Sequence, residues 1–489
     1  MNEKKSSRAR REAELRRRLD ELFLSRKPGA PPSHPTVQEA PQRPPQPAAM
    51  NETLAPSAGF PWRRFWLSGL AALLLGSLVL LFWYVLRPRP AAIHLALSRS
   101  WNAYGKIVAT PFLAGQPGAV FLGVGDQNGF FSVFEGKSGR VSLRYHALGE
   151  IVSSPLYADL GDGPAWILAK RGGQTHVLRP DGVWLWKSRP EDGLAGLVGR
   201  PARILIEGVP HLVLADLRGQ IACLEGRHGI PRWLRRDAAS AGSMLFASPL
   251  AWDGKVFFAS TRGDFFAVDA ATGRDLWRTD VSNEVRASPV LVRLGLGRWA
   301  IGVVDLEGGW VLCRIDDGGV IARAKLEGGS IASPIAVEQG PAASDRVYVA
   351  TRQGALLRLD PTTAAVRARY QAAPGDGFRS SPIAFDADGD GAPEILAFTG
   401  AGRLLLLDAK KLEPRLPPYP LGGEITASPV AADVDQDGQN EIVAALESGE
   451  ILLLSLTTTP KADRGSARSP VTGFRGDGRN TGRFPAPKE

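Results

Sequence analysis

The sequence predicts an all-β fold: an eight-bladed β-propeller of four-stranded blades, preceded by one transmembrane helix and a basic, helical or disordered N-terminal segment. Three observations lead to this prediction. A short motif returns eight times along the chain, and the segments between its copies read as short strands separated by glycine turns. One uncharged apolar run stands before the first copy.

The composition is that of a globular chain with many turns. Of 489 residues, 44% are hydrophobic and 22% are charged, which excludes disorder along the whole chain. The 55 glycines and 38 prolines indicate turns, and two cysteines exclude a disulfide-stapled fold. Residues 1–64 hold 13 Lys and Arg against 7 Asp and Glu, so they carry +6 of the net charge of +9. The rest is nearly balanced, so we expect no nucleic-acid partner.

Residues 1–64 are expected to form a cytoplasmic segment made of a basic helix and a proline-rich linker. The apolar residues of the helix, within 8–26, recur at helical spacing among basic ones: Leu15, Leu19, Leu22 and Phe23. This helix lies on the anionic inner leaflet, binds a partner, or is a solvated, partly helical tail. Residues 28–61 contain 10 prolines in 34 positions, which is typical of a semi-extended linker.

A transmembrane helix is predicted over Phe65–Leu86, because these 22 residues contain no charge. As a helix they span about 33 Å, enough for a hydrocarbon core of about 30 Å. Arg63 and Arg64 precede the span, and the positive-inside rule places that side in the cytoplasm. The preceding segment is too long for the n-region of a cleaved signal peptide. We therefore expect an uncleaved signal anchor in a bacterial inner membrane, with the body in the periplasm.

The body repeats the motif small–Ser/Thr–Pro–apolar. Its prolines stand at positions 111, 155, 201, 249, 289, 334, 382 and 429, so seven intervals cover 318 residues (429 − 111). The copy at 199–202, GRPA, is degenerate. The clearest repeat reads as four strands: Phe246–Ala251, Lys255–Thr261, Asp264–Asp269 and Arg274–Val281. Four strands in about 45 residues are typical of a propeller blade, so residues 93–459 are expected to form the ring.

The ring is expected to close through its N-terminal strand. The eighth repeat supplies only three strands, at Ile425–Ala432, Glu441–Leu446 and Glu450–Leu456. A spare strand, Ile93–Trp101, precedes the first motif, in the place that a fourth strand has before the next motif. We predict that it completes blade eight as the outer strand, which protects the sheet edges. Residues 460–489 are expected to be a C-terminal tail.

One repeat resembles a known superfamily. Ala267–Trp277 (AVDAATGRDLW) is similar to the repeat Ala-x-Asp-x-x-Thr-Gly-x-x-x-Trp of the quinoprotein-like (PQQ-like) eight-bladed propellers. These include pyrroloquinoline-quinone (PQQ) alcohol dehydrogenases and the BamB-like scaffold proteins. The resemblance covers roughly residues 93–456 and implies that the Trp docks onto the neighbouring blade. The segment Gly473–Gly482 also resembles a short sequence common at the ends of such proteins.

Two acidic loops carry the candidate metal ligands. DADGDGAPEI (386–395) and DVDQDGQNEI (433–442) both begin four residues after a motif proline. Acids at positions 1, 3, 5 and 9, a turn glycine at 6 and the carbonyl of position 7 offer the oxygen ligands that Ca²⁺ favours. The alternative is an Asp/Gly-rich turn without a metal.

The spacing resembles the FG-GAP (integrin-α-type) calcium loops, with Glu in place of Asp at position 9. That resemblance implies five ligands in each loop: Asp386, Asp388, Asp390, Ala392 and Glu394 in the first, and Asp433, Asp435, Asp437, Gln439 and Glu441 in the second. We expect the ions to be structural.

No catalytic residue and no PQQ are expected. A quinone dehydrogenase needs a cofactor floor and calcium ligands at the ring axis, and it often has adjacent cysteines, whereas Cys223 and Cys313 lie about two blades apart. The six histidines show no metal-ligand spacing and no catalytic grouping. The expected function is a non-catalytic, membrane-tethered scaffold for an unidentified protein or glycan partner. The alternatives are a calcium-dependent adhesion or sensory ectodomain and a PQQ-dependent dehydrogenase.

Overall fold

The computed structural model describes residues 92–116, 118–188, 194–340, 342–459 and 480–484. The basic segment, the linker and the predicted membrane helix Phe65–Leu86 lie outside these residues. Within the described ranges, no helix has the length and apolarity needed to span a bilayer. The chain divides into two units, Met1–Arg87 and Pro88–Glu489, and the described residues all belong to the second.

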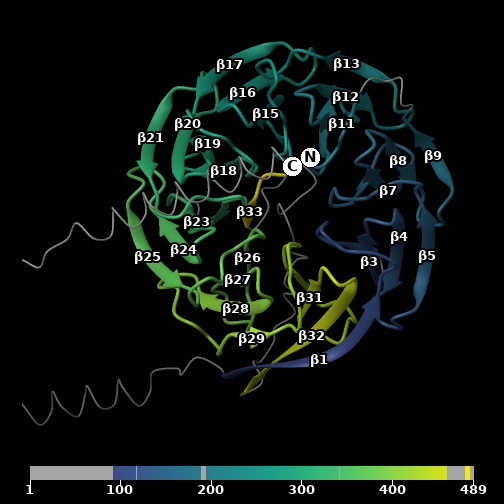
Figure 1. The fold of residues 1–489 in the computed structure, drawn as a ribbon, viewed down its shortest axis with the longest axis vertical. Coiled ribbons are helices and arrows are strands. Elements are labelled where there is room, and N and C mark those ends of the chain that lie inside the picture. Colours follow the sequence, from purple (N-terminus) through teal and green to yellow (C-terminus); the bar gives the residue numbers. More distant parts are fainter. Residues whose placement is uncertain (1–91, 117, 189–193, 341, 460–479, 485–489) are drawn as a thin grey trace, which may run out of the picture. The chain divides into compact units, whose positions relative to one another are not determined.

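The described residues form eight β-sheets arranged as a ring (Figure 1), which confirms the predicted eight-bladed propeller. In chain order, blades one and two consist of β2 (Phe112–Gln116), β3 (Ala119–Gly125), β4 (Phe130–Glu135), β5 (Val141–His146), β6 (Leu156–Asp159), β7 (Pro164–Ala169), β8 (Thr175–Leu178) and β9 (Trp184–Lys187). Blades three and four consist of β10 (Ala202–Ile206), β11 (Val209–Ala215), β12 (Ile221–Glu225), β13 (Pro231–Arg235), β14 (Leu250–Trp252), β15 (Lys255–Ala259), β16 (Asp264–Asp269) and β17 (Asp275–Asp280).

The second half of the ring repeats this plan, with one addition in blade six. Blades five and six consist of β18 (Val290–Arg293), β19 (Trp299–Val304), β20 (Gly309–Arg314), β21 (Val320–Lys325), β22 (Ile335–Val337), β23 (Arg346–Ala350), β24 (Ala355–Leu359), β25 (Val366–Gln371) and the extra strand β33 (Arg483–Phe484). Blades seven and eight consist of β26 (Ile383–Phe385), β27 (Glu394–Phe398), β28 (Arg403–Asp408), β29 (Tyr419–Pro420), β30 (Val430–Ala432), β31 (Glu441–Ala445), β32 (Glu450–Thr459) and β1 (Ala92–Asn102).

The ring closes as predicted. β1 pairs antiparallel with β32, from Ile93 opposite Thr458 to Trp101 opposite Ile451, and a bulge follows Leu97. The indole Nε1 of Trp101 also donates to the Gly139 carbonyl of blade one, at 2.8 Å. The first strand of the body therefore completes blade eight and ties it to blade one.

Tryptophans on the outer strands join neighbouring blades, as the resemblance implied. Each indole Nε1 donates to a carbonyl in the next blade's turn: Trp186 to Gly226 at 2.7 Å, Trp233 to Ala270 at 2.8 Å and Trp277 to Ile315 at 2.8 Å. Gly273, with φ of 71°, lies under the Trp233 ring, and a Cβ there would come within 2.8 Å of it. The Thr-Gly turn thus leaves the space that the indole fills.

The recurring Ser/Thr-Pro motif forms a ring of hydrogen bonds around the axis. At seven of the eight blade junctions, a backbone N–H donates to the motif hydroxyl of the next blade at 2.8–3.1 Å: Thr110 to Ser154, Arg200 to Ser248, Ser248 to Ser288, Ser288 to Ser333, Ser333 to Ser381, Ser381 to Ser428 and Ser428 to Thr110. The remaining junction, from blade two to blade three, has Arg200 in place of the hydroxyl residue. The predicted Phe246–Ala251 strand starts later than expected, because the motif precedes the regular pairing, which begins only at Leu250 and continues to Trp252.

Two faces of the ring follow from the strand directions. The face here called the hairpin face carries the turns between first and second strands and between third and fourth strands. The opposite face, here called the loop face, carries the other turns and the connections from one blade to the next. Fourth strands run from the hairpin face to the loop face, so β1 begins at the hairpin face.

Candidate functional site

The C-terminal segment 480–484 lies at the ring axis, among the innermost strands (Figure 1). β33 pairs in parallel with β22, placing Arg483 opposite Ala336 and Phe484 opposite Val337. The carbonyl of Thr481 accepts the backbone N–H of Leu291 in β18, at 2.8 Å. Within the expected C-terminal tail, residues 460–489, Arg483 and Phe484 instead form a fifth strand of blade six.

Asn480 anchors this segment in blades three and four. It is fully buried, and its Oδ1 accepts from Nε of Arg200 at 2.6 Å. Its Nδ2 donates to the carbonyls of Arg200, Pro201 and Pro249 at 3.0, 3.3 and 2.8 Å. Arg200 belongs to the degenerate motif copy GRPA, so the one repeat that lacks the hydroxyl supplies the contact for Asn480.

Arg483 anchors the segment in blades five and six. Its Nε and Nη2 lie 2.8 and 3.1 Å from the two carboxylate oxygens of Asp345, and its Nη2 lies 3.2 Å from Glu338. The guanidinium also stands 5.3 Å from the centre of the Trp299 ring. Burial raises the pKa of Glu338, but hydrogen bonds and charge from Arg293 and Arg483 outweigh it and hold this pKa below its ordinary value. The chain's own C-terminal residues thus occupy the axis with paired charges.

Each acidic loop gathers three of its predicted ligands. One oxygen from each carboxylate lies within 4.8 Å of the others in two clusters: Asp386, Asp388 and Glu394 in blade seven, and Asp433, Asp435 and Glu441 in blade eight. The turn glycines Gly391 and Gly438 have φ of 86° and 88°, so the sharp turn expected at position 6 is present. The two loops also touch, because Nδ2 of Asn440 donates to the Asp386 carbonyl at 3.1 Å.

The other predicted ligands lie at the outer side of the loops. Asp390 and Asp437 are exposed and stand outside the clusters. Their Oδ1 atoms accept the backbone N–H of Ala392 and of Gln439, both at 2.7 Å. Ala392 and Gln439 stay candidate ligands through their carbonyl oxygens.

Burial dominates the electrostatics of both clusters. Glu394 and Glu441 are 1% and 0% exposed, and burial raises the pKa of each to about 8, with neighbouring aspartates adding to the shift. A backbone N–H offsets part of this, from Ala387 to Glu394 at 2.9 Å and from Val434 to Glu441 at 2.8 Å. Crowded carboxylates with so little solvent fit a hard cation such as Ca²⁺.

The two clusters differ in whether a described arginine side chain pairs with their carboxylates. Arg415 lies against the blade-seven cluster, where its Nη2 pairs with Asp388 and its Nη1 lies 3.3 Å from Glu394. In blade eight, Oε1 of Glu441 is buried and has no hydrogen-bond partner among the described residues. The sequence pattern treats the loops as equivalent, and the side chains around them are not.

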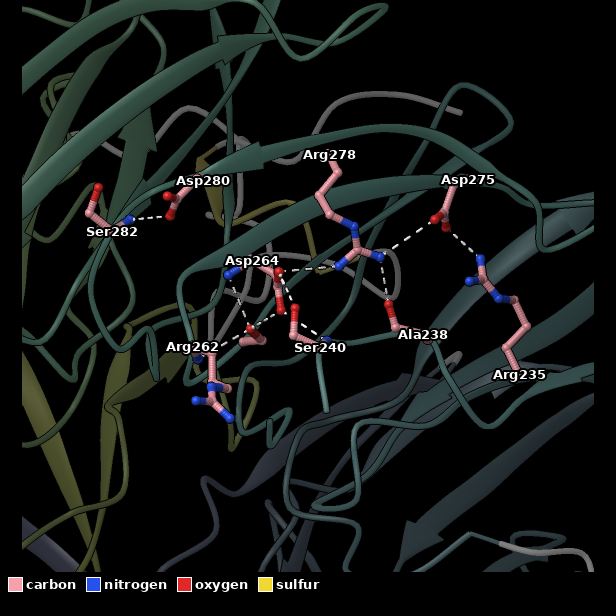
Figure 2. Close-up of polar contacts among 10 residues, drawn as sticks. Arg235, Ala238, Ser240, Arg262, Asp264, Asp275, Arg278, Asp280 and Ser282 are labelled. Atoms are coloured by element: carbon pink, nitrogen blue, oxygen red, sulfur yellow. Dashed lines mark hydrogen bonds and ion pairs between the residues drawn. The ribbon is translucent and has the colours of Figure 1, made fainter. Parts of the chain in front are cut away.

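The loop face is held by polar contacts between blades, shown in Figure 2 for blades three and four. Asp264 accepts from the N–H and hydroxyl of Ser240 at 3.1 and 2.8 Å and lies 3.3 Å from Arg278. Burial raises the pKa of Asp264, but hydrogen bonds from Ser240 and Ser260 and the charge of Arg278 outweigh it, so the pKa falls. Arg278 in turn donates to the Ala238 carbonyl at 2.7 Å. These contacts fix the connection into blade four.

The two cysteines are structural core residues. Cys223 in β12 and Cys313 in β20 are both fully buried and free. Burial raises the pKa of the first thiol to about 12 and of the second to about 11, which suppresses the thiolate form. Both side chains belong to hydrophobic core clusters of the described residues.

A family model described as outer membrane protein assembly factor BamB matches residues 98–293 and 171–415. The chain belongs to the BamB family. A BamB from Burkholderia pseudomallei (strain K96243) is 29% identical over 165 residues, which are 32% of this chain. That match spans 38% of the length of the Burkholderia protein.

Solved structures share the propeller fold with this BamB-family chain. BamB from Moraxella catarrhalis superposes with a TM-score of 0.55 at 15% identity, over 74% of this chain and 97% of its own. Quinohemoprotein alcohol dehydrogenase from Comamonas testosteroni superposes with a TM-score of 0.57 at 13% identity, over 78% of each chain. At such identities both similarities concern the fold alone.

Proposed function

We propose that this chain is a non-catalytic scaffold of the BamB type, tethered to a bacterial inner membrane with its propeller in the periplasm. The observation that carries the proposal is the C-terminal segment at the ring axis. The axis is where the dehydrogenase alternative requires a cofactor floor, and here Asn480 and Arg483 fill it with buried, hydrogen-bonded side chains. Membership of the BamB family supports a role in protein binding.

The strand directions favour one orientation toward the membrane. Six residues, 87–92, separate the predicted span Phe65–Leu86 from Ile93, and an extended chain covers at most about 3.6 Å per residue. β1 begins at the hairpin face. We therefore infer that the hairpin face lies near the bilayer and that the loop face is open to a protein partner.

Exposed apolar side chains support this orientation. Of the 14 exposed large hydrophobic residues among those described, ten lie at the hairpin-face ends of strands or in the turns there: Val141, Val183, Trp184, Leu205, Val209, Ile230, Leu276, Leu296, Val320 and Val366. On the loop face stand Tyr104, Leu148 and Met244. Burying apolar side chains in the interfacial region of a bilayer lowers the free energy of membrane association.

Two exposed leucines at opposite faces offer a matched test. Leu148 follows β5 on the loop face and is 79% exposed, and Leu296 lies in the β18–β19 turn on the hairpin face and is 84% exposed. A photo-crosslinking amino acid at each position, in the full chain in cells, is expected to capture a discrete protein at 148 and lipid at 296. Capture of the same protein at 296, with none at 148, would reverse the orientation. Capture of no protein at either position would remove the scaffold proposal.

We also propose that Ca²⁺ binds the acidic loops as a structural ion. The deepest ligands, Glu394 and Glu441, are buried, which favours an ion that holds a turn in place over one that bridges to an exposed partner. The acidic loops join first and second strands and so lie on the hairpin face, so the calcium-dependent adhesion alternative predicts protein capture at position 296 that a chelator abolishes. The scaffold proposal predicts that protein capture at position 148 persists in the chelator.

A further inference from the structure

Arg415 occupies the place of a cation in the blade-seven loop. Its guanidinium contacts two of the three clustered acids, Asp388 and Glu394, and its side chain is 14% exposed. Its own backbone is fixed, because the Arg415 N–H donates to the Leu406 carbonyl at 2.8 Å. An arginine held this way gives the carboxylates the opposite charge that an ion would supply, with N–H hydrogen bonds in place of coordination bonds.

Among the described residues, no arginine pairs with the blade-eight cluster as Arg415 does with the blade-seven cluster, and the fold gives the reason. Arg415 belongs to the connection between β28 and β29, the third and fourth strands of blade seven. In blade eight the third strand is β32 and the fourth is β1, which comes from the other end of the body. Closing the ring with β1 therefore removes the turn that carries Arg415 in blade seven.

Glu441 gives independent support for a cation site in blade eight. Its side chain is 0% exposed, its Oε2 accepts from Val434, and its Oε1 is buried with no hydrogen-bond partner among the described residues. Its carboxylate belongs to the cluster with Asp433 and Asp435. A buried carboxylate oxygen without a partner is costly, and coordination to a cation satisfies it.

We propose that the two loops are unequal: the blade-eight loop binds Ca²⁺ tightly, and Arg415 competes with the ion for the blade-seven loop. This inference rests on the calcium part of the proposed function. It assigns Arg415 as the residue that sets the number of ions bound, and it makes Glu441 and Glu394 a matched pair at position 9 of their loops.

The test is equilibrium dialysis of the full chain, in detergent and after chelation, against radioactive Ca²⁺. The wild type is expected to bind one ion tightly, and Glu441→Gln is expected to weaken that site at least tenfold. Glu394→Gln is expected to leave it unchanged, and Arg415→Gln is expected to raise the tight stoichiometry from one to two. Circular dichroism of each variant checks that the β-fold is retained.

Each other outcome overturns a defined part of the reasoning. Two equally tight ions in the wild type, or no change in Arg415→Gln, would refute the competition and leave the calcium proposal standing. No binding by the wild type would refute the calcium proposal itself. Neither result touches the scaffold proposal, which the crosslinking from Leu148 and Leu296 tests separately. If Arg415→Gln fails to fold, Arg415→Lys is the second variant, expected to weaken the competition because lysine cannot contact both acids in the same fork geometry.

Discussion

Truncating Arg483 is expected to destabilise the propeller strongly. Arg483→Ala removes two contacts to Asp345 and one to Glu338. The side chains of Arg483 and Asp345 are 3% and 0% exposed, so this ion pair is buried. Removing one partner of a buried ion pair typically costs about 3–5 kcal/mol in the free energy of unfolding. Arg483→Lys keeps the charge and loses the two-pronged geometry, so its cost is expected to lie between those of alanine and wild type.

The assay is urea unfolding of the full chain in detergent, followed by tryptophan fluorescence. The matched control is Arg171→Ala, which breaks the pair with Glu150 at 3.0 Å where the side chains are 57% and 43% exposed. That surface pair is expected to contribute less than about 1 kcal/mol. If Arg483→Ala costs no more than Arg171→Ala, the C-terminal segment is not bound at the axis as described.

Three further outcomes are expected. Trp277→Ala should lose about 3–5 kcal/mol in urea unfolding, because a 7% exposed indole and its bond to Ile315 are removed, whereas the 52% exposed Trp184→Ala should lose less than about 1 kcal/mol. Ser288→Ala should cost about 1–2 kcal/mol in the same assay, because the Ser248 N–H loses its acceptor, and a neutral result would argue against the hydrogen-bond ring. His176 has its pKa lowered to about 4 by burial and then by Lys170 and Lys187, so its folded form resists protonation. The wild type should therefore lose stability as pH falls from about 6.5 toward 4, by about 2 kcal/mol after solvent screening. His176→Phe should show a smaller loss of stability between pH 7 and 4.5. Equal losses in the two proteins would contradict the lowered pKa of His176.

The fold was predictable because the sequence pattern that specifies one blade recurs along the chain. The Ser/Thr-Pro motif marks each inner strand, and its regular spacing sets the number of blades before any strand is assigned. The closing strand was predictable from a count, since the last repeat is one strand short and Ile93–Trp101 is one strand too many. The role of the motif hydroxyl could not be predicted from the sequence. Aligning the repeats shows that the hydroxyl recurs, but not that the N–H of Ser248 in one blade donates to the hydroxyl of Ser288 in the next.

The contacts that distinguish the site could not be predicted, since they join residues far apart in the chain. Asn480 binds Arg200, which lies 280 positions earlier in the chain. The local sequence GRPA does not indicate that its arginine contacts the segment 480–484. Arg415 lies 27 positions after Asp388, in a turn that the loop pattern does not include. The acidic pattern itself predicted the clusters, but their inequality depends on which strand happens to complete each blade.

Closure by β1 also sets an order of events for the nascent chain. Asn102 leaves the ribosome 348 positions before Glu450, the residue that it pairs with (450 − 102). Until β32 has been synthesised, β1 lacks its partner strand, and the growing array of blades keeps unpaired sheet edges. Contacts between residues so far apart in the sequence form slowly. Quality control of this protein should therefore focus on the interval between synthesis of blade one and arrival of β32, when an incomplete arc can join a neighbouring molecule in place of its own first strand.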